Sequence, residues 1–164
     1  MIKELRIDDR LIHGQVALKW PAALGINRIV VVNETASRNK MQEQSLKMAV
    51  PSNIKVLVKN IEDANVLFNN PQMNSVDIMV IVNTVKDALS IVEKHENLVK
   101  RVNVANVGRF DGIDKAEKLI LNSNILLNHE DEKALRYLLD NTNVEIVQQI
   151  VPDNPVEKIK NFID

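Results

Sequence analysis

The sequence predicts an α/β fold in which one open, mainly parallel β-sheet carries helices on both faces. Runs rich in β-branched residues alternate with helical patterns of about ten to fifteen residues, which is typical of βαβ units. The segments IVVV (29–32) and IMVIV (78–82) are apolar at every position, as in strands buried on both faces. No repeat, linker or low-complexity stretch interrupts the 164 residues, so we expect a single domain over residues 1–164.

The first half of the chain predicts three complete strand–helix alternations. IKELRI opens the chain as a strand, and apolar positions with helical spacing follow, in a helix that Pro21 should bend because proline lacks an amide N–H. Pro51 and Pro71 are expected to end the next two helices. The predicted strands of this half are 2–7, 28–33 and 54–58, and the predicted helices are 14–24, 39–50 and 61–70.

The second half continues the alternation. Thr84 with Asp87 three residues later resembles a helix start, and a strand then leads into a glycine turn. The stretch after that turn indicates a β segment or a hairpin, at 116–128. The predicted strands are 76–82, 100–108 and 144–151, and the predicted helices are 84–95, 130–141 and 155–163.

Composition excludes several classes of function. The formal net charge of −1 gives no bulk attraction to nucleic acid or anionic lipid, and the absence of cysteine excludes thiolate chemistry. The start of the chain lacks a signal-peptide pattern, and no apolar run approaches the ~18 residues of a membrane helix. The motifs of P-loop, dinucleotide-binding, zinc and serine-hydrolase sites are absent. We therefore expect a cytoplasmic protein that needs no metal and no cofactor.

The loop after the first strand is the first candidate site, because ligands of open α/β sheets bind beyond the carboxyl ends of the strands. It lies in RIDDRLIHGQV, residues 6–16, and places His13 at a helix start, where free N–H groups attract anions. Arg10 and Arg6 can add guanidinium donors, and Gly14 allows close backbone approach. Asp8 or Asp9 can accept one imidazole N–H and leave the other nitrogen free as a nucleophile. Phosphoryl transfer asks for little more than such positioning and charge.

The first motif closely resembles the phosphorylation-site signature of the IIB components of the mannose–fructose–sorbose family of the bacterial sugar phosphotransferase system. RIVVVNETA, SLKMAVP, ANVG and VEIVQQIVP add weaker likenesses in the family's order. The resemblance implies that His13 takes a phosphoryl group on Nδ1 from a phosphohistidine of the partner IIA and passes it to a sugar carried by the membrane subunits IIC and IID. The chain would then be a protein–phosphohistidine–sugar phosphotransferase, associated peripherally with those subunits. In this interpretation Arg10, Asp8 and Asp9 support catalysis, and the phosphate is bound by Arg6, Gly14, Gln15 and Gly108.

Exposed cations near the site predict how a partner is recognised. Arg10, Arg38, Lys40 and Arg109 form a plausible positive rim for phospho-IIA, with Phe110 beside them; Arg109 and Phe110 stand where the family often has a small residue and Met. Two other classes stay open on the residues alone: a receiver-like domain phosphorylated on aspartate, and a non-catalytic module that binds an anion or a protein. The sugar is not indicated, and the oligomeric state is open, a homo-oligomer included.

Overall fold

The chain folds around one seven-stranded sheet and a separate two-stranded hairpin. The structure is a computed structural model that describes the backbone of residues 1–164 and all side chains except those of Gln15 and Val16. The strands are β1 (Ile2–Asp8), β2 (Arg28–Val32), β3 (Lys55–Lys59), β4 (Ile78–Val82), β5 (Arg101–Asn106), β6 (Leu119–Asn122), β7 (Ile125–Leu127), β8 (Glu145–Gln148) and β9 (Glu157–Lys158). The α-helices are α1 (Gly14–Leu24), α2 (Glu34–Ser37), α3 (Lys40–Met48), α4 (Ile61–Phe68), α5 (Val85–His95) and α6 (His129–Asn141).

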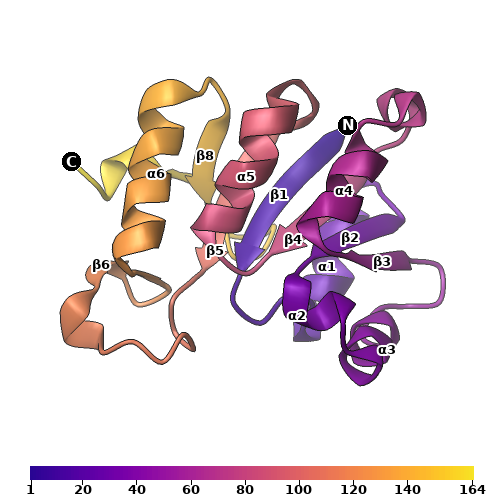
Figure 1. Cartoon of the computed structure of the whole chain (residues 1–164), viewed down its shortest axis with the longest axis horizontal. Helices are drawn as coiled ribbons and strands as arrows, with labels where there is room; N and C mark the ends of the chain where they lie inside the picture. Colours follow the sequence, from indigo (N-terminus) through magenta and orange to yellow (C-terminus); the bar gives the residue numbers. More distant parts are fainter.

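The strand order of the large sheet places β1 near its centre. The order is β3-β2-β4-β1-β5-β8-β9, and every neighbouring pair is parallel except β8 and β9. The chain leaves β1 toward β2 and leaves β5 toward β8, so the connections diverge between two adjacent strands (Figure 1). A crevice outside the carboxyl ends at such a switch point is the usual ligand position in open α/β sheets.

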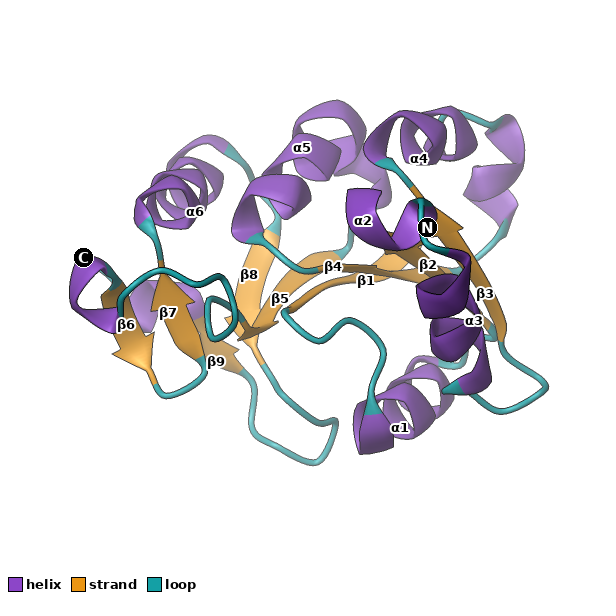
Figure 2. Ribbon diagram, turned by 60° about the horizontal axis from the view of Figure 1, so that its bottom comes forward, coloured by secondary structure: helices purple, strands orange, loops and turns teal.

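Helices cover both faces of the sheet, as the sequence predicts. Helices α4, α5 and α6 lie on one face, and α1 and α3 lie on the other (Figure 2). The first face holds the larger apolar cluster, to which β1 contributes Leu5 and Ile7. The α1 face of β1 is instead polar: Glu4, Arg6 and Asp8 have no exposed surface. Burying three charged side chains is costly unless each is paired, which points to a specific role for this part of the sheet.

Most predicted elements are confirmed, and the differences have physical reasons. The hairpin predicted within 116–128 is the antiparallel pair β6–β7, and α1 continues through Pro21 to Leu24. The helix predicted at 155–163 is wrong. Residues 157–158 pair with β8 instead, and a 3₁₀ turn, Ile159–Asn161, places the Ile159 side chain in the core. Helix α2 was not expected, because four residues are too few to show a helical pattern.

Candidate functional site

The loop between β1 and α1 turns sharply and is anchored at both ends. The Leu11 N–H donates to the Asp8 carbonyl at 2.9 Å, and the Asp9 N–H donates to the Asn106 carbonyl on β5 at 2.9 Å. Leu11 adopts a positive φ of 58°, uncommon for a residue with a branched side chain, and both Leu11 and Ile12 are buried. The two apolar side chains thus fix the loop on the sheet and place His13 next to the end of β1.

Asp8 is the centre of the site. Its side chain has no exposed surface, and its Oδ2 accepts from the Nε and Nη2 of Arg6 at 3.3 and 3.0 Å and from the Nδ2 of Asn106 at 3.3 Å. Its Oδ1 accepts from the Arg10 N–H at 3.1 Å. Burial acts to raise the pKa of Asp8, but the charge of Arg6 and the hydrogen bonds from His13 and Arg10 outweigh it, so the pKa lies below its ordinary value. Asp8 is therefore an ionised acceptor.

His13 contacts this carboxylate through one ring nitrogen only. Its Nε2 lies 3.1 Å from Asp8 Oδ2, and its side chain is 20% exposed. Because Asp8 only accepts, Nε2 carries the proton and Nδ1 is left without one in the neutral ring. His13 is also the N-cap residue of α1, but its side chain makes no capping hydrogen bond. The imidazole thus lies beside the positive end of a helix with one nitrogen occupied.

Arg6 has a different position from the one predicted. The sequence suggested that it binds phosphate, but its side chain is fully buried and its guanidinium is directed at Asp8. Its Nη1 lies 3.5 Å from the Gln149 carbonyl, and its guanidinium carbon lies 5.8 Å from the ring centre of Trp20. Trp20 is itself fixed by an indole N–H donated to the Ile150 carbonyl at 2.9 Å. Arg6 therefore holds Asp8 from behind and does not face a ligand.

The second predicted loop meets the first through Asp9. Arg109 donates from Nε and Nη2 to Asp9 at 3.0 and 2.6 Å, and this bidentate pair joins the loops after β1 and β5. Arg109 is therefore not the free cation that the sequence suggested, although Phe110 beside it is 67% exposed. Gly108 is buried, and a Cβ at this position would overlap the carbonyl group of Leu126. Its lack of a side chain is thus required for packing against β7.

The remaining predicted residues lie at the same edge of the sheet. Arg10 is exposed, and its side chain makes no ion pair in the part of the chain that the structure describes. Arg38 is 81% exposed and lies 3.6 Å from Glu34, while Lys40 at the start of α3 is also exposed. Gly14 is exposed with φ at 45°, a conformation that favours glycine. The side chain of Gln15 lies outside the described residues.

Two Asn residues were missed by sequence reasoning. Asn106 at the end of β5 donates to Asp8, and Asn124 in the β6–β7 turn donates from Nδ2 to Asn106 Oδ1 at 2.8 Å. A polar residue within the apolar strand run VNVANV was the available signal for Asn106. Nothing comparable marks Asn124, because it lies in a polar turn.

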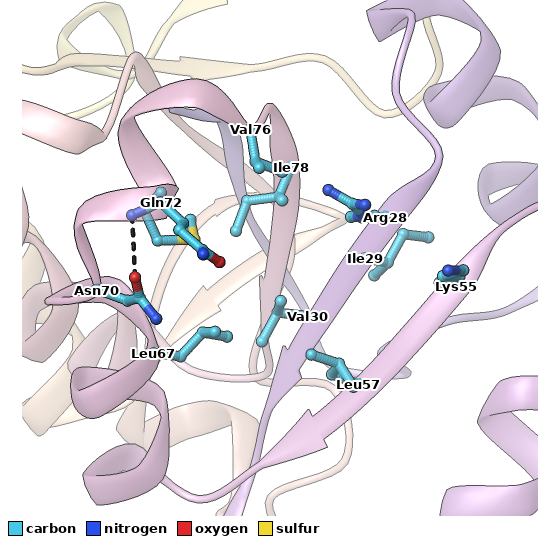
Figure 3. A pocket seen from close by; sticks show the side chains of 11 residues that line it. Arg28, Ile29, Val30, Lys55, Leu57, Leu67, Asn70, Gln72, Val76 and Ile78 are labelled. Carbon is cyan, nitrogen blue, oxygen red and sulfur yellow. Dashed lines mark hydrogen bonds between the residues drawn. The ribbon is translucent and has the colours of Figure 1, made fainter.

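A mainly apolar cavity lies far from this loop. It has a volume of about 310 Å³ and lies where β2 and β3 begin, at the opposite edge of the sheet, between Val30, Leu57 and the segment after α4 (Figure 3). Arg28 and Lys55 stand at its rim. Among the side chains that the structure describes, no group of His, Asp or Glu converges as a metal site requires.

The fold and the loop together define a class: an α/β domain that presents one histidine, held by a buried carboxylate, at a topological switch point. The family model for the PTS system sorbose subfamily IIB component matches residues 2–164, and the chain belongs to that family. It is 43% identical over 164 residues to a probable phosphotransferase enzyme IIB component of Streptococcus pyogenes serotype M6, with both chains covered completely. It is 28% identical to the sorbose-specific EIIB component of Klebsiella pneumoniae, over 97% of this chain and 93% of that one.

Solved structures agree with this assignment. The crystal structure of the IIBSor domain of the Klebsiella pneumoniae sorbose permease matches with a TM-score of 0.85 at 25% identity, over 98% of this chain and 95% of that one. The protein is thus a phosphotransferase-system IIB component, and the fold class predicted from the sequence is confirmed. No helix of the described chain is both long and apolar enough to span a bilayer. A receiver-like role for Asp8 has no support, because this carboxylate is buried and both of its oxygens are engaged.

Proposed function

We propose that His13 accepts a phosphoryl group on Nδ1 from a phosphohistidine of a IIA protein or domain and passes it to a sugar. The observation that carries this proposal is the contact between His13 Nε2 and the buried carboxylate of Asp8 at 3.1 Å. It assigns the proton to Nε2 and leaves the lone pair of Nδ1 available for attack. The protein is accordingly a protein–phosphohistidine–sugar phosphotransferase that works without a bound metal or nucleotide.

The same tautomer serves both transfer steps. In the first, the Nδ1 lone pair forms the N–P bond while the P–N bond of the donor breaks and its electron pair returns to the donor imidazole. Phosphorylated His13 then has imidazolium character, which the Asp8 carboxylate stabilises through Nε2–H. In the second step a sugar hydroxyl attacks phosphorus, the P–Nδ1 electron pair returns to His13, and a base on the sugar's side takes the hydroxyl proton. No proton of His13 has to move in either step.

The charge of the transferred phosphoryl group is stabilised by groups other than Asp8 and the side chains bound to it. The first turn of α1 presents backbone N–H groups that lack helical acceptors, and the exposed Arg10 adds a cation with a planar donor fork. Gly14 leaves open space at the helix start. Arg6, by contrast, acts only through Asp8. The site thus separates the groups that orient His13 from those that neutralise the phosphoryl oxygens.

The partners follow from this role. Phospho-IIA is the donor, and the membrane subunits IIC and IID present the sugar, so the protein works at the cytoplasmic face of the membrane. A relative from Escherichia coli is a mannose-specific EIIAB component, of which the matching region spans 47%. Other relatives are named for sorbose and fructose. A sugar of this group is the substrate that we propose, with donor and acceptor reached in turn by the same exposed edge.

Labelling by the phosphotransferase chain tests the proposal. The protein is incubated with phosphoenolpyruvate, the general phosphotransferase proteins and IIA, and one acid-labile phosphohistidine is expected. His13→Ala should abolish the label and keep the fold, because the residue contributes little packing. His95→Ala and His129→Ala are the matched controls and should label normally. Full labelling of His13→Ala, or base-labile phosphate on an aspartate, would overturn the assignment.

A further inference from the structure

Three hydrogen bonds connect the β6–β7 hairpin to His13 through Asp8, which accepts from both sides. Asn124 Nδ2 lies 2.8 Å from Asn106 Oδ1, Asn106 Nδ2 lies 3.3 Å from Asp8 Oδ2, and His13 Nε2 lies 3.1 Å from the same Oδ2. Asp8 and Asn106 are paired in the register of β1 and β5, and both are buried. The chain of contacts joins residues far apart in the sequence into one unit behind the imidazole.

The direction of these hydrogen bonds follows from the charge of Asp8. Two N–H groups of Arg6 hold Asp8 ionised, so Oδ2 can only accept. Asn106 therefore presents its NH₂ group to Asp8, and its oxygen faces the other way. A flipped Asn106 amide would set an oxygen against the carboxylate inside the protein, where an unmatched acceptor is costly. The NH₂ group of Asn124 satisfies the Asn106 oxygen and excludes that flip.

Asn124 is itself fixed by the backbone of the hairpin. Its N–H donates to Asn122 Oδ1 at 2.9 Å, and its carbonyl accepts from the Val107 N–H at 2.9 Å. Asn122 in turn donates from Nδ2 to Gln148 Oε1 on β8 at 2.7 Å. The approach of β7 to the end of β5 also requires Gly108, which has no room for a side chain. The small sheet thus holds one amide in place beside the site.

We propose that Asn106 and Asn124 are positioning residues that keep the unprotonated nitrogen of His13 on the side of the phosphoryl group. Four donor atoms from three residues converge on Asp8 Oδ2, and only His13 can change its contribution by exchanging tautomers. The N–H groups of Arg6 and the amide of Asn106 are fixed in their orientation. Asp8 Oδ2 therefore receives a hydrogen bond from His13 only when the His13 proton is on Nε2. The consequence for transfer rests on the proposed function, whereas the tautomer is a property of the unphosphorylated protein alone.

Two isosteric substitutions each replace an amide NH₂ donor of this chain of hydrogen bonds by a carboxylate oxygen. Asn106→Asp places a second carboxylate against Asp8, so the two must share a proton that competes with the His13 N–H. Asn124→Asp places an oxygen against Asn106 Oδ1 and turns the Asn106 amide, so that the Asn106 oxygen faces Asp8. An acceptor at this position favours a proton on Asp8, and a protonated Asp8 can donate to His13 Nε2 and leave the imidazole proton on Nδ1. Asn74→Asp is the matched control, because it makes the same chemical change at an exposed position of the opposite sheet edge.

Two-bond ¹H–¹⁵N correlation of the imidazole at mildly alkaline pH measures the His13 tautomer directly. The wild type and Asn74→Asp should hold Nε2–H, and Asn106→Asp and Asn124→Asp should shift the tautomer ratio toward Nδ1–H by about tenfold or more, as expected for losing a hydrogen bond to a charged group. Circular dichroism verifies folding; if the buried Asn106→Asp variant does not fold, the half-buried Asn124→Asp alone decides. An unchanged ratio in the folded variants overturns the proposal.

Transfer kinetics separate this proposal from the function on which it rests. For Asn124→Asp we expect kcat for transfer from phospho-IIA to fall about tenfold with an unchanged KM, since the exposed edge is intact. A shifted tautomer with a wild-type kcat would overturn the positioning role. A wild-type protein that holds the Nε2–H tautomer but takes up no phosphoryl group would overturn the function and support the tautomer assignment.

Discussion

Replacing Asp8 by Asn tests the electrostatic centre of the site, because this change keeps the shape and removes the charge. Arg6 is fully buried, and both of its hydrogen bonds to a carboxylate end at Asp8 Oδ2. Removing one partner of a buried ion pair costs about 3–5 kcal/mol. The charge of Glu4 also favours the charged form of Arg6. We therefore expect the free energy of unfolding to fall by about 3 kcal/mol, near the lower end of this range. That is a large share of the free energy of unfolding of a typical domain, which is roughly 5–15 kcal/mol.

Urea unfolding followed by circular dichroism measures this loss. The double variant Arg6→Gln with Asp8→Asn should lose less than the sum of the single variants, because the neutral pair no longer buries a lone charge. The pKa of folded Asp8 lies below its unfolded value, so its stabilisation is complete above the unfolded pKa and is lost as pH falls through the folded one. The difference between wild type and Asp8→Asn should therefore shrink below about pH 4. A loss under about 1 kcal/mol, or additive single losses, would refute the reasoning.

Three further predictions concern the surrounding residues. Arg10→Ala should slow transfer from phospho-IIA by something approaching ~10³-fold, and Arg10→Lys should recover part of that rate; a wild-type rate in Arg10→Ala would assign the cation elsewhere. Burial raises the pKa of Asp131 to about 6. A raised folded pKa destabilises the protein as pH rises from about 4 to 6. Asp131→Asn, whose Oδ1 can still accept from Lys86 N–H, should then be more stable at pH 7 by about 3 kcal/mol at most, and urea unfolding should show no gain near pH 4; a pH-independent gain contradicts this. Reversing charge at Arg38 or Lys40 should raise the KM for phospho-IIA and weaken its salt dependence at unchanged kcat in stopped-flow transfer, and no change in KM would show that recognition is apolar.

The overall fold was predictable because it depends on local pattern. Fully apolar strand runs and the helices between them specify a parallel sheet covered on both faces, and the motif with His13 then falls at the ligand-binding edge. The C-terminal strand and turn, where the sequence predicts a helix, were not predictable in the same way. Val156, Ile159 and Ile163 have helical spacing, but pairing of Glu157 and Lys158 with β8 overrides it. Tertiary pairing of this kind is invisible in a short amphipathic window.

The nucleophile of the site was predictable from the sequence, but the residues that hold it in position were not. The sequence places Asp8, Arg10 and His13 in one loop, so their proximity follows from the motif. The burial of Arg6 depends on Trp20 and the segment after β8, and the Asp9–Arg109 pair spans 100 residues. Asn106 and Asn124 meet through the pairing of β5 with the hairpin. Contacts between distant segments decide whether a charged residue faces a ligand or supports another side chain.

The position of the phosphoryl group on His13 tests the central claim most directly. The protein is labelled with ¹⁵N in its histidines and phosphorylated by phospho-IIA, and the one-bond ³¹P–¹⁵N coupling identifies the bonded ring nitrogen. Because Nε2 is held by the buried Asp8 carboxylate, phosphorus should couple to Nδ1 of His13, and the Nε2 proton should persist in the phosphorylated ring. Phosphorus on Nε2, or on another residue while His13 is intact, would contradict the account.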